Sequence, residues 1–208
     1  MKKTCEKWEQ PLQAGIQAGK FGAHLFSEFE TRAKDVSSEV FRIKKVDEAR
    51  KIILDIVKKT SAQSVALALC PLIEASGIVD ELKNNGVTIY TEQTDIAENI
   101  STADIGISGV EFGIAECGSV CQDATAIEDR LVSSLPPLHI VFMESSNIVP
   151  GIEDAIDIIS RFFTEGYISW ITGPSRTADI ERVLTIGVHG PSRFVIIAVD
   201  EGTDGGAV

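Results

Sequence analysis

Residues 64–90 read SVALALCPLIEASGIVDELKNNGVTIY and predict a strand, a helix and a second strand in succession. The nearly continuous apolar run at the start has the length of a buried strand. Pro71 suits the first turn of a helix, which we expect to run to about Lys83 before Asn84-Asn85-Gly86 ends it. Strands joined by a helix pair in parallel, so this stretch predicts an α/β fold.

The same alternation continues on both sides of this stretch. We expect further strands at residues 39–44, 104–108, 138–143, 167–172 and 193–200, and further helices at 46–57, 128–133 and 152–163. Gly113 and Gly118 indicate bends within a sheet or hairpin. Residues 37–208 are therefore predicted to form one α/β domain, with a mostly parallel sheet flanked by helices.

The first 36 residues differ from the rest. Apolar and small residues recur at steps of three and four and predict a helix over about residues 10–33, in an N-terminal helical arm comprising residues 1–36. The aromatic residues of this region either fill the protein's own core, which is the preferred interpretation, or form a docking surface. They are Trp8, Phe21, Phe26 and Phe29.

Composition narrows the function classes. The 208 residues carry 19 Lys and Arg against 31 Asp and Glu, a net charge of −12, which disfavours nucleic-acid and membrane partners. The basic N-terminus has no apolar region after it and the apolar runs are too short to span a bilayer, so we expect a cytoplasmic protein. The four cysteines lack the spacings typical of zinc or iron–sulfur sites, and the sequence predicts no metal and no cofactor.

Residues 171–181, ITGPSRTADIE, follow a predicted strand and are expected to open a helix. Gly173 and Pro174 set a tight turn, and Ser175 or Thr177 can cap the helix. Free amides at a helix N-terminus, together with the Arg176 guanidinium, would bind an anion. The alternative is plain capping, in which Asp179 and Glu181 satisfy the helix dipole and Arg176 makes a surface pair.

Two further segments carry groups suited to proton transfer. His189 lies between glycines in GVHGP (187–191), where it is either an accessible acid–base group or a structural turn residue. Glu116, beside Cys117 in AECGS (115–119), is either a base with a raised pKa or an ion-paired structural group. A nucleophilic role for Cys117 needs a nearby base, and a small buried cysteine is the commoner case.

Several well-known motifs are absent. The glycines at 106, 109 and 113 do not form G-x-G-x-x-G, and there is neither G-x-x-x-x-G-K-[ST] nor G-x-S-x-G. A Rossmann dinucleotide site, a Walker site and an α/β-hydrolase are therefore rejected.

Three segments together resemble the LUD domain, the lactate utilization protein C family: Gly106 to Ser119, His139 to Pro150, and Thr172 to Glu181 with Gly187 to Pro191. The resemblance implies a NagB/RpiA/CoA-transferase-like fold. It also implies a component of L-lactate oxidation to pyruvate that works beside iron–sulfur partner proteins without carrying the cluster. Cys117 stands where the family usually has Thr; if that hydroxyl contacts a ligand in the family, this protein is expected to differ in its ligand or its affinity.

We expect a small anionic ligand at the carboxyl ends of the parallel strands. The expected ligand-binding residues are Ser108, Gly118, Ser119, Gly173, Pro174, Ser175, Arg176, Thr177, Asp179 and Gly190, with Glu116 and His189 as catalytic candidates. Two alternatives stay open: a stand-alone phosphosugar-isomerase-like or CoA-transferase-like enzyme using Glu116, and an interaction protein without a small ligand. A homo-oligomer is also an option.

Overall fold

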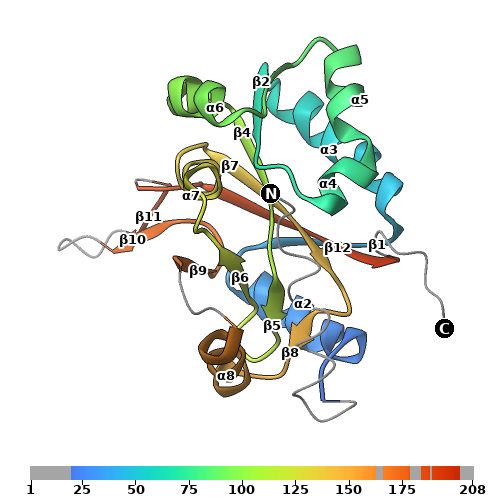
Figure 1. The fold of residues 1–208 in the computed structure, drawn as a ribbon, viewed down its shortest axis with the longest axis vertical. Helices are drawn as coiled ribbons and strands as arrows, with labels where there is room; N and C mark the ends of the chain where they lie inside the picture. The colour runs from blue at the N-terminus through green and yellow to red at the C-terminus, as the bar shows by residue number, and fades with distance from the viewer. Residues whose placement is uncertain (1–19, 163–165, 179–183, 188, 202–208) are drawn as a thin grey trace.

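The structure, a computed structural model, describes residues 20–162, 166–178, 184–187 and 189–201 (Figure 1). Its centre is a six-stranded sheet in the order β1-β12-β7-β4-β2-β3, in which every neighbouring pair is parallel. The strands are β1 (Glu39–Lys45), β2 (Ser64–Leu67), β3 (Thr88–Tyr90), β4 (Ile105–Gly109), β7 (Leu138–Glu144) and β12 (Arg193–Glu201). The predicted α/β class with a mostly parallel sheet is confirmed.

Helices cover one face of this large sheet. They are α3 (Ala49–Thr60), α4 (Pro71–Ser76) and α5 (Ile78–Asn84), with the short 3-10 turn η2 (Val46–Glu48) before them. Their apolar side chains form one buried cluster with alternate residues of the strands, such as Ile105, Ile140 and Ile197. The predicted single helix from Pro71 to Lys83 is wrong, because Gly77 takes a left-handed φ of +67° and divides it into α4 and α5.

The opposite face is covered in two parts. Next to β2 and β4 lie α6 (Gln93–Asn99), η3 (Ile100–Thr102) and α7 (Ile127–Ser134). Next to β7 and β12 lie α2 (Phe26–Asp35) and a four-stranded sheet, which share a second buried cluster with Val141 and Ile196. Parallel strands with both faces covered read as continuous apolar runs, which is what 194–199 shows.

The small sheet was not predicted as a separate layer. Its order is β8 (Ile148–Val149), β5 (Phe112–Ile114), β6 (Ser119–Asp123) and β9 (Ile168–Ile171). The helix α8 (Ile152–Phe162) packs on it through Ala155 and Ile158. Figure 1 shows α8 at the end of the molecule opposite α5 and α6.

The predicted N-terminal helix lies partly outside the described residues. Within them, the α-helix begins at Phe26, preceded by the turn η1 (Ala23–Leu25) and by Gly22 at a φ of +126°. The predicted helix over 10–33 is therefore confirmed for residues 26–33 and wrong for 20–25, where Gly22 takes a positive φ and a 3-10 turn follows; residues 10–19 lie outside the described residues. Phe26 and Phe29 are buried in the protein's own core, in agreement with the interpretation preferred from the sequence. Trp8 lies outside the described residues.

The connections that leave β2 and β4 run in opposite directions across the sheet. From β2 the chain passes through α4 and α5 to β3 at one edge, whereas from β4 it passes through the small sheet and α7 to β7 on the other side. The carboxyl ends of β2 and β4 therefore flank a topological switch point. Of the helices in the described residues, none is both long and apolar enough to cross a bilayer.

Candidate functional site

The segment around Arg176 forms a hairpin, so the prediction that it opens a helix is wrong. β10 (Arg176–Ala178) pairs antiparallel with β11 (Leu184–Ile186), and Asp179 with the rest of 179–183 lies outside the described residues. Thr and Ile are residue types that favour strands, and Ser and Thr serve turns as readily as helix caps. Gly173, at a φ of +73°, makes the turn that leads into the hairpin.

The hairpin is anchored at the amino ends of the parallel strands. The Ser175 N–H donates to the Pro191 carbonyl (2.8 Å), and the Ser192 N–H donates to the Pro137 carbonyl (2.9 Å). Pro191 lies just before β12 and Pro137 just before β7. The expectation that this loop lies at the carboxyl ends is therefore wrong. The reason is topological: the loop precedes β12 and pairs with the chain that enters it.

The Ser175 backbone is not free for a ligand. Its N–H is bonded to Pro191, and its carbonyl accepts from the Gly187 N–H (2.9 Å). Pro174 is buried, and a Cβ on Gly173 would lie 2.2 Å from the Val36 carbonyl oxygen, so this turn is closely packed. The Ser175 N–H and carbonyl thus hold the loop together, and the Arg176 side chain is exposed beside them.

Arg176 is exposed, and among the described residues its guanidinium has one side-chain hydrogen-bond partner. One guanidinium nitrogen donates to Ser37 Oγ (2.7 Å), and no carboxylate within the described part of the chain forms an ion pair with it. A Cβ on Gly190 would lie 3.2 Å from Ser175 Cβ, so Gly190 packs beside the Arg176 loop. His189, the residue before Gly190, is exposed. The Arg176 loop and Gly190 therefore lie in one region, and His189 is the chain neighbour of Gly190.

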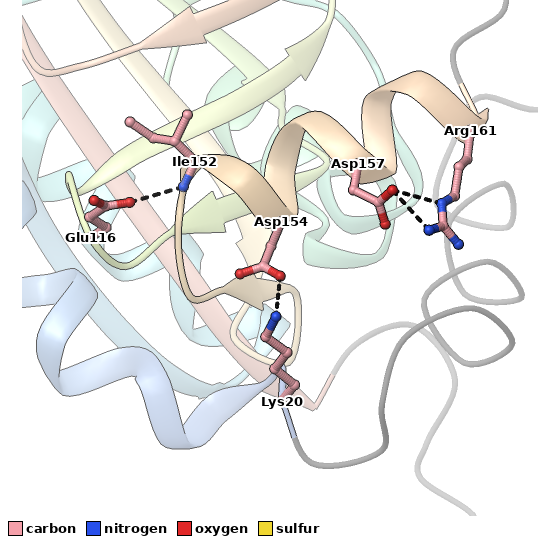
Figure 2. Close-up of polar contacts among 6 residues, drawn as sticks. All are labelled: Lys20, Glu116, Ile152, Asp154, Asp157 and Arg161. Atoms are coloured by element: carbon pink, nitrogen blue, oxygen red, sulfur yellow. Dashed lines mark hydrogen bonds and ion pairs between the residues drawn. The ribbon is translucent and has the colours of Figure 1, made fainter.

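Glu116 is engaged elsewhere. Its Oε2 accepts from the Ile152 N–H (3.0 Å) at the start of α8, and a Cβ on Gly151 would lie 2.8 Å from that oxygen (Figure 2). A carboxylate at a helix N-terminus satisfies a free N–H and the helix dipole. Nothing in the described structure joins Glu116 to Arg176 or His189. This geometry favours the structural alternative for Glu116.

Ser119 connects the two main segments. Its Oγ lies 2.7 Å from Thr172 Oγ1, next to the Gly173 turn, and accepts from the Cys117 thiol (3.1 Å). Gly118 has a φ of +64°, and a Cβ there would lie 2.1 Å from the Ala33 backbone nitrogen. Gly118 therefore permits close packing of this turn against α2.

Ser108 belongs to a different, buried cluster. Its Oγ lies 2.8 Å from His139 Nε2 and accepts from Gln122 Nε2 (2.9 Å), which also donates to the Gly109 carbonyl (3.2 Å). Burial lowers the pKa of His139 to about 3, so the ring is neutral at pH 7. Sequence reasoning named neither Gln122 nor His139 as a site residue. The sequence signal that could have identified them is the presence of a polar residue within an apolar strand segment.

Cys70 lies at the carboxyl end of β2 beside this cluster. A Cβ on Gly109 would lie 2.8 Å from its sulfur. Desolvation raises the pKa of the thiol to about 12, and the Glu111 and Asp129 carboxylates act in the same direction against the Leu72 and Ile73 amides. Burial also raises the pKa of Cys121. Both thiols are therefore protonated, and neither is an activated nucleophile. The described residues contain no group of three potential metal ligands.

The fold and these three segments define a member of the LUD domain family, whose model matches residues 26–199. The chain belongs to this family. It is 31% identical to lactate utilization protein C of Halalkalibacterium halodurans, over 76% of this chain and 71% of the relative. It is 34% identical to lactate utilization protein C of Bacillus pumilus, over 59% of this chain and 55% of that relative, so it spans little more than half of the second protein.

A solved structure supports the fold. The crystal structure of a DUF162 family protein from Deinococcus radiodurans matches with a TM-score of 0.59 and 19% identity, covering 85% of this chain and 97% of that one. At this identity the match concerns the fold alone.

Proposed function

We propose that this protein takes part in lactate utilization, as a component of a system that oxidises L-lactate to pyruvate. The observation that carries the proposal is membership of the LUD domain family, with relatives named lactate utilization protein C. We further propose iron–sulfur proteins as its partners in that system. The spacing of the four cysteines in the sequence, which is not that of an iron–sulfur site, supports a subunit that depends on others for electron transfer.

The proposed ligand is a small anion bound at the Arg176 loop. An exposed guanidinium without a carboxylate partner in the described chain can receive a carboxylate through paired N–H donors. The other proposed contributors are Ser119 through Thr172, the loop residues Gly173, Pro174, Ser175, Thr177 and Asp179, and Gly190. His189 is the proposed proton-transfer group, because it is exposed beside this loop.

The alternative of a stand-alone isomerase-like or transferase-like enzyme receives no support from the geometry. It required Glu116 as base or nucleophile, and that carboxylate caps α8. We therefore retain Glu116 as a structural residue.

Deletion of the gene in its own organism tests the role in lactate utilization. We expect slow growth on L-lactate, normal growth on glucose, and rescue by the wild-type gene. Normal growth on L-lactate, in a strain without a second copy of the gene, would contradict the proposal.

Binding measurements test the anion site separately. L-Lactate, pyruvate and inorganic phosphate are titrated into the purified protein by calorimetry, and the Arg176→Gln variant should bind the preferred anion about tenfold more weakly. Arg161→Gln is the matched control, because Arg161 is also exposed but pairs with Asp157 on α8 (Figure 2). Equal affinities in wild type and Arg176→Gln would exclude Arg176 as the contact.

A further inference from the structure

Exposed apolar side chains gather around the outer strand of the small sheet. Six large apolar residues are exposed in the described part of the chain, and four of them belong to β9, to the residue before it, or to α8. These four are Ile152, Ile156, Tyr167 and Trp170. Trp170 is opposite Cys121, whose side chain packs in the cluster under α8, so Trp170 lies on the face of the sheet that α8 covers.

The exposed apolar side of α8 is the side nearer to β9. Lys20 pairs with Asp154 of α8 (Figure 2), and the Gly22 N–H donates to the carbonyl of Ile148 in β8. The side of α8 that carries Asp154 is therefore the side of β8, at one edge of the small sheet. Ile156 follows two positions later, about 200° around the helix, and so lies on the opposite side, toward β9. Neighbouring exposed apolar residues of this kind mark an interaction surface.

The outer side of β9 also presents backbone groups. The small sheet ends at β9, and no strand of the described residues pairs with its outer side. The Ala124 N–H donates to the Tyr167 carbonyl directly across the ladder (2.7 Å), so residues 167, 169 and 171 direct their backbone groups toward β6. The N–H and carbonyl groups of Ile168 and Trp170 therefore point outward.

This edge lacks the features that usually prevent two sheets from pairing. Charged residues, Pro and very short strands protect exposed edges. The edge strand β1 has the charged sequence EVFRIKK, and the edge strand β3 is three residues long. Residues 166–173, in contrast, contain neither a charged residue nor Pro. Two copies of a chain with a net charge of −12 repel one another, so an uncharged segment is where they can come into contact.

We propose that two copies of the protein associate through β9, in an antiparallel pair whose two-fold axis passes beside Ser169. Ser169 is the middle of the ladder 167–171, so this register uses all of it, and the outward groups of Ile168 meet those of Trp170 in the second copy. The two Ser169 side chains then face one another, where opposite residues are closest and a small residue fits. Each Trp170 is covered by Ile168 of the other copy. The proposal does not depend on a role in lactate utilization.

The association state of the wild-type chain is the first test. Sedimentation equilibrium from about 2 to 200 μM should show a reversible monomer–dimer equilibrium. In the Trp8→Phe background, the Trp170 emission should move to shorter wavelength as the concentration rises, because the partly exposed indole becomes buried. A monomer over the whole range would overturn the proposal, and so would a dimer without a change in Trp170 emission.

A cysteine at the two-fold axis tests the register. Opposite residues that share no hydrogen bond have Cα atoms about 4.5 Å apart, within reach of a disulfide. Ser169→Cys should therefore form a disulfide between two copies under mild oxidation, and peptide mapping should find residue 169 joined to residue 169. Ser101→Cys is the control, because Ser101 is exposed in η3, on the part of the molecule that carries α6. Absence of the 169–169 link would overturn the register.

A charge at the same position tests the interface itself. Ser169→Lys places two like charges together at the axis and should weaken dimerisation by about tenfold or more. Ser101→Lys should dimerise as the wild type does. Unchanged dimerisation in Ser169→Lys would place the interface elsewhere and overturn the proposal. If circular dichroism shows that Ser169→Lys does not fold, the wild-type chain and Ser169→Cys decide.

Discussion

At the scale of single residues, the buried His139 makes a measurable prediction about acid stability. Its pKa is about 3 in the folded protein and about 6.5 when unfolded. Because the pKa is lower in the folded protein, the unfolded chain binds the proton at a higher pH than the folded protein does. The contribution of the neutral ring to the free energy of unfolding is therefore complete above pH 6.5 and is lost as the pH falls toward 3. The extra slope is about 1.4 kcal/mol per pH unit in this window.

Urea unfolding of the wild type and of His139→Phe between pH 7 and 4 measures that slope. The variant lacks the titrating ring, so its free energy of unfolding should fall less steeply below pH 6.5. At pH 7 the free energy of unfolding of the variant also changes for a reason unrelated to titration, because Ser108 loses a hydrogen-bond partner. Parallel curves for the two proteins would show that His139 does not remain neutral in the folded state.

At the scale of elements, α8 depends on a carboxylate from another segment. Glu116 accepts the Ile152 N–H, which has no acceptor within the helix. Glu116→Ala should lower the free energy of unfolding by about 1 kcal/mol. Glu116→Gln keeps an acceptor oxygen and should lose less. Urea denaturation measures both, and a loss that is equal for Ala and Gln would mean that the charge matters more than the hydrogen bond.

A second element-scale prediction concerns the contact between α2 and the turn after β5. At Gly118 a new Cβ meets the Ala33 backbone at 2.1 Å, and the φ is +64°. Gly86 has a similar φ of +75° with nothing within 4 Å of a new Cβ. Gly118→Ala should therefore destabilise by about 3 kcal/mol, through strain and overpacking. Gly86→Ala carries the backbone strain alone and should cost about 1 kcal/mol. Thermal unfolding of the two variants separates backbone strain from overpacking. Equal losses of stability in Gly118→Ala and Gly86→Ala would refute the packing argument.

At the scale of the whole molecule, the positions of strands and helices could be predicted from the sequence better than the pairing of the strands. Apolar runs such as 194–199 are read from composition, because both faces of a parallel sheet are buried. The pairing of β1 with β12, between residues 39–45 and 193–201, depends on contacts across the whole chain and leaves no local signal. The small sheet is hidden for the same reason.

The candidate site shows the same division between local and distant information. That the Arg176 loop and Gly190 lie together follows from a short hairpin. The prediction that residues 172–181 open a helix was wrong, because the Ser, Thr and Gly residues that suit helix caps are also favoured in turns. Gln122 and His139 meet Ser108 only through three strands that are distant in sequence. Such a cluster is found by geometry and not by pattern.

The two sheets share one buried cluster, which predicts that they unfold together. Phe29 of α2, Val120 of the small sheet and Ile196 of the large sheet all belong to it. Trp170 lies in the small sheet, so in a Trp8→Phe background its fluorescence reports that sheet alone. The urea transition of Trp170 should then coincide with that of far-ultraviolet circular dichroism, as expected for one cooperative unit. Ile140→Val in β7, about 1 kcal/mol destabilising, should move both midpoints equally. Two separated transitions would instead make the small sheet with α8 an independent folding unit.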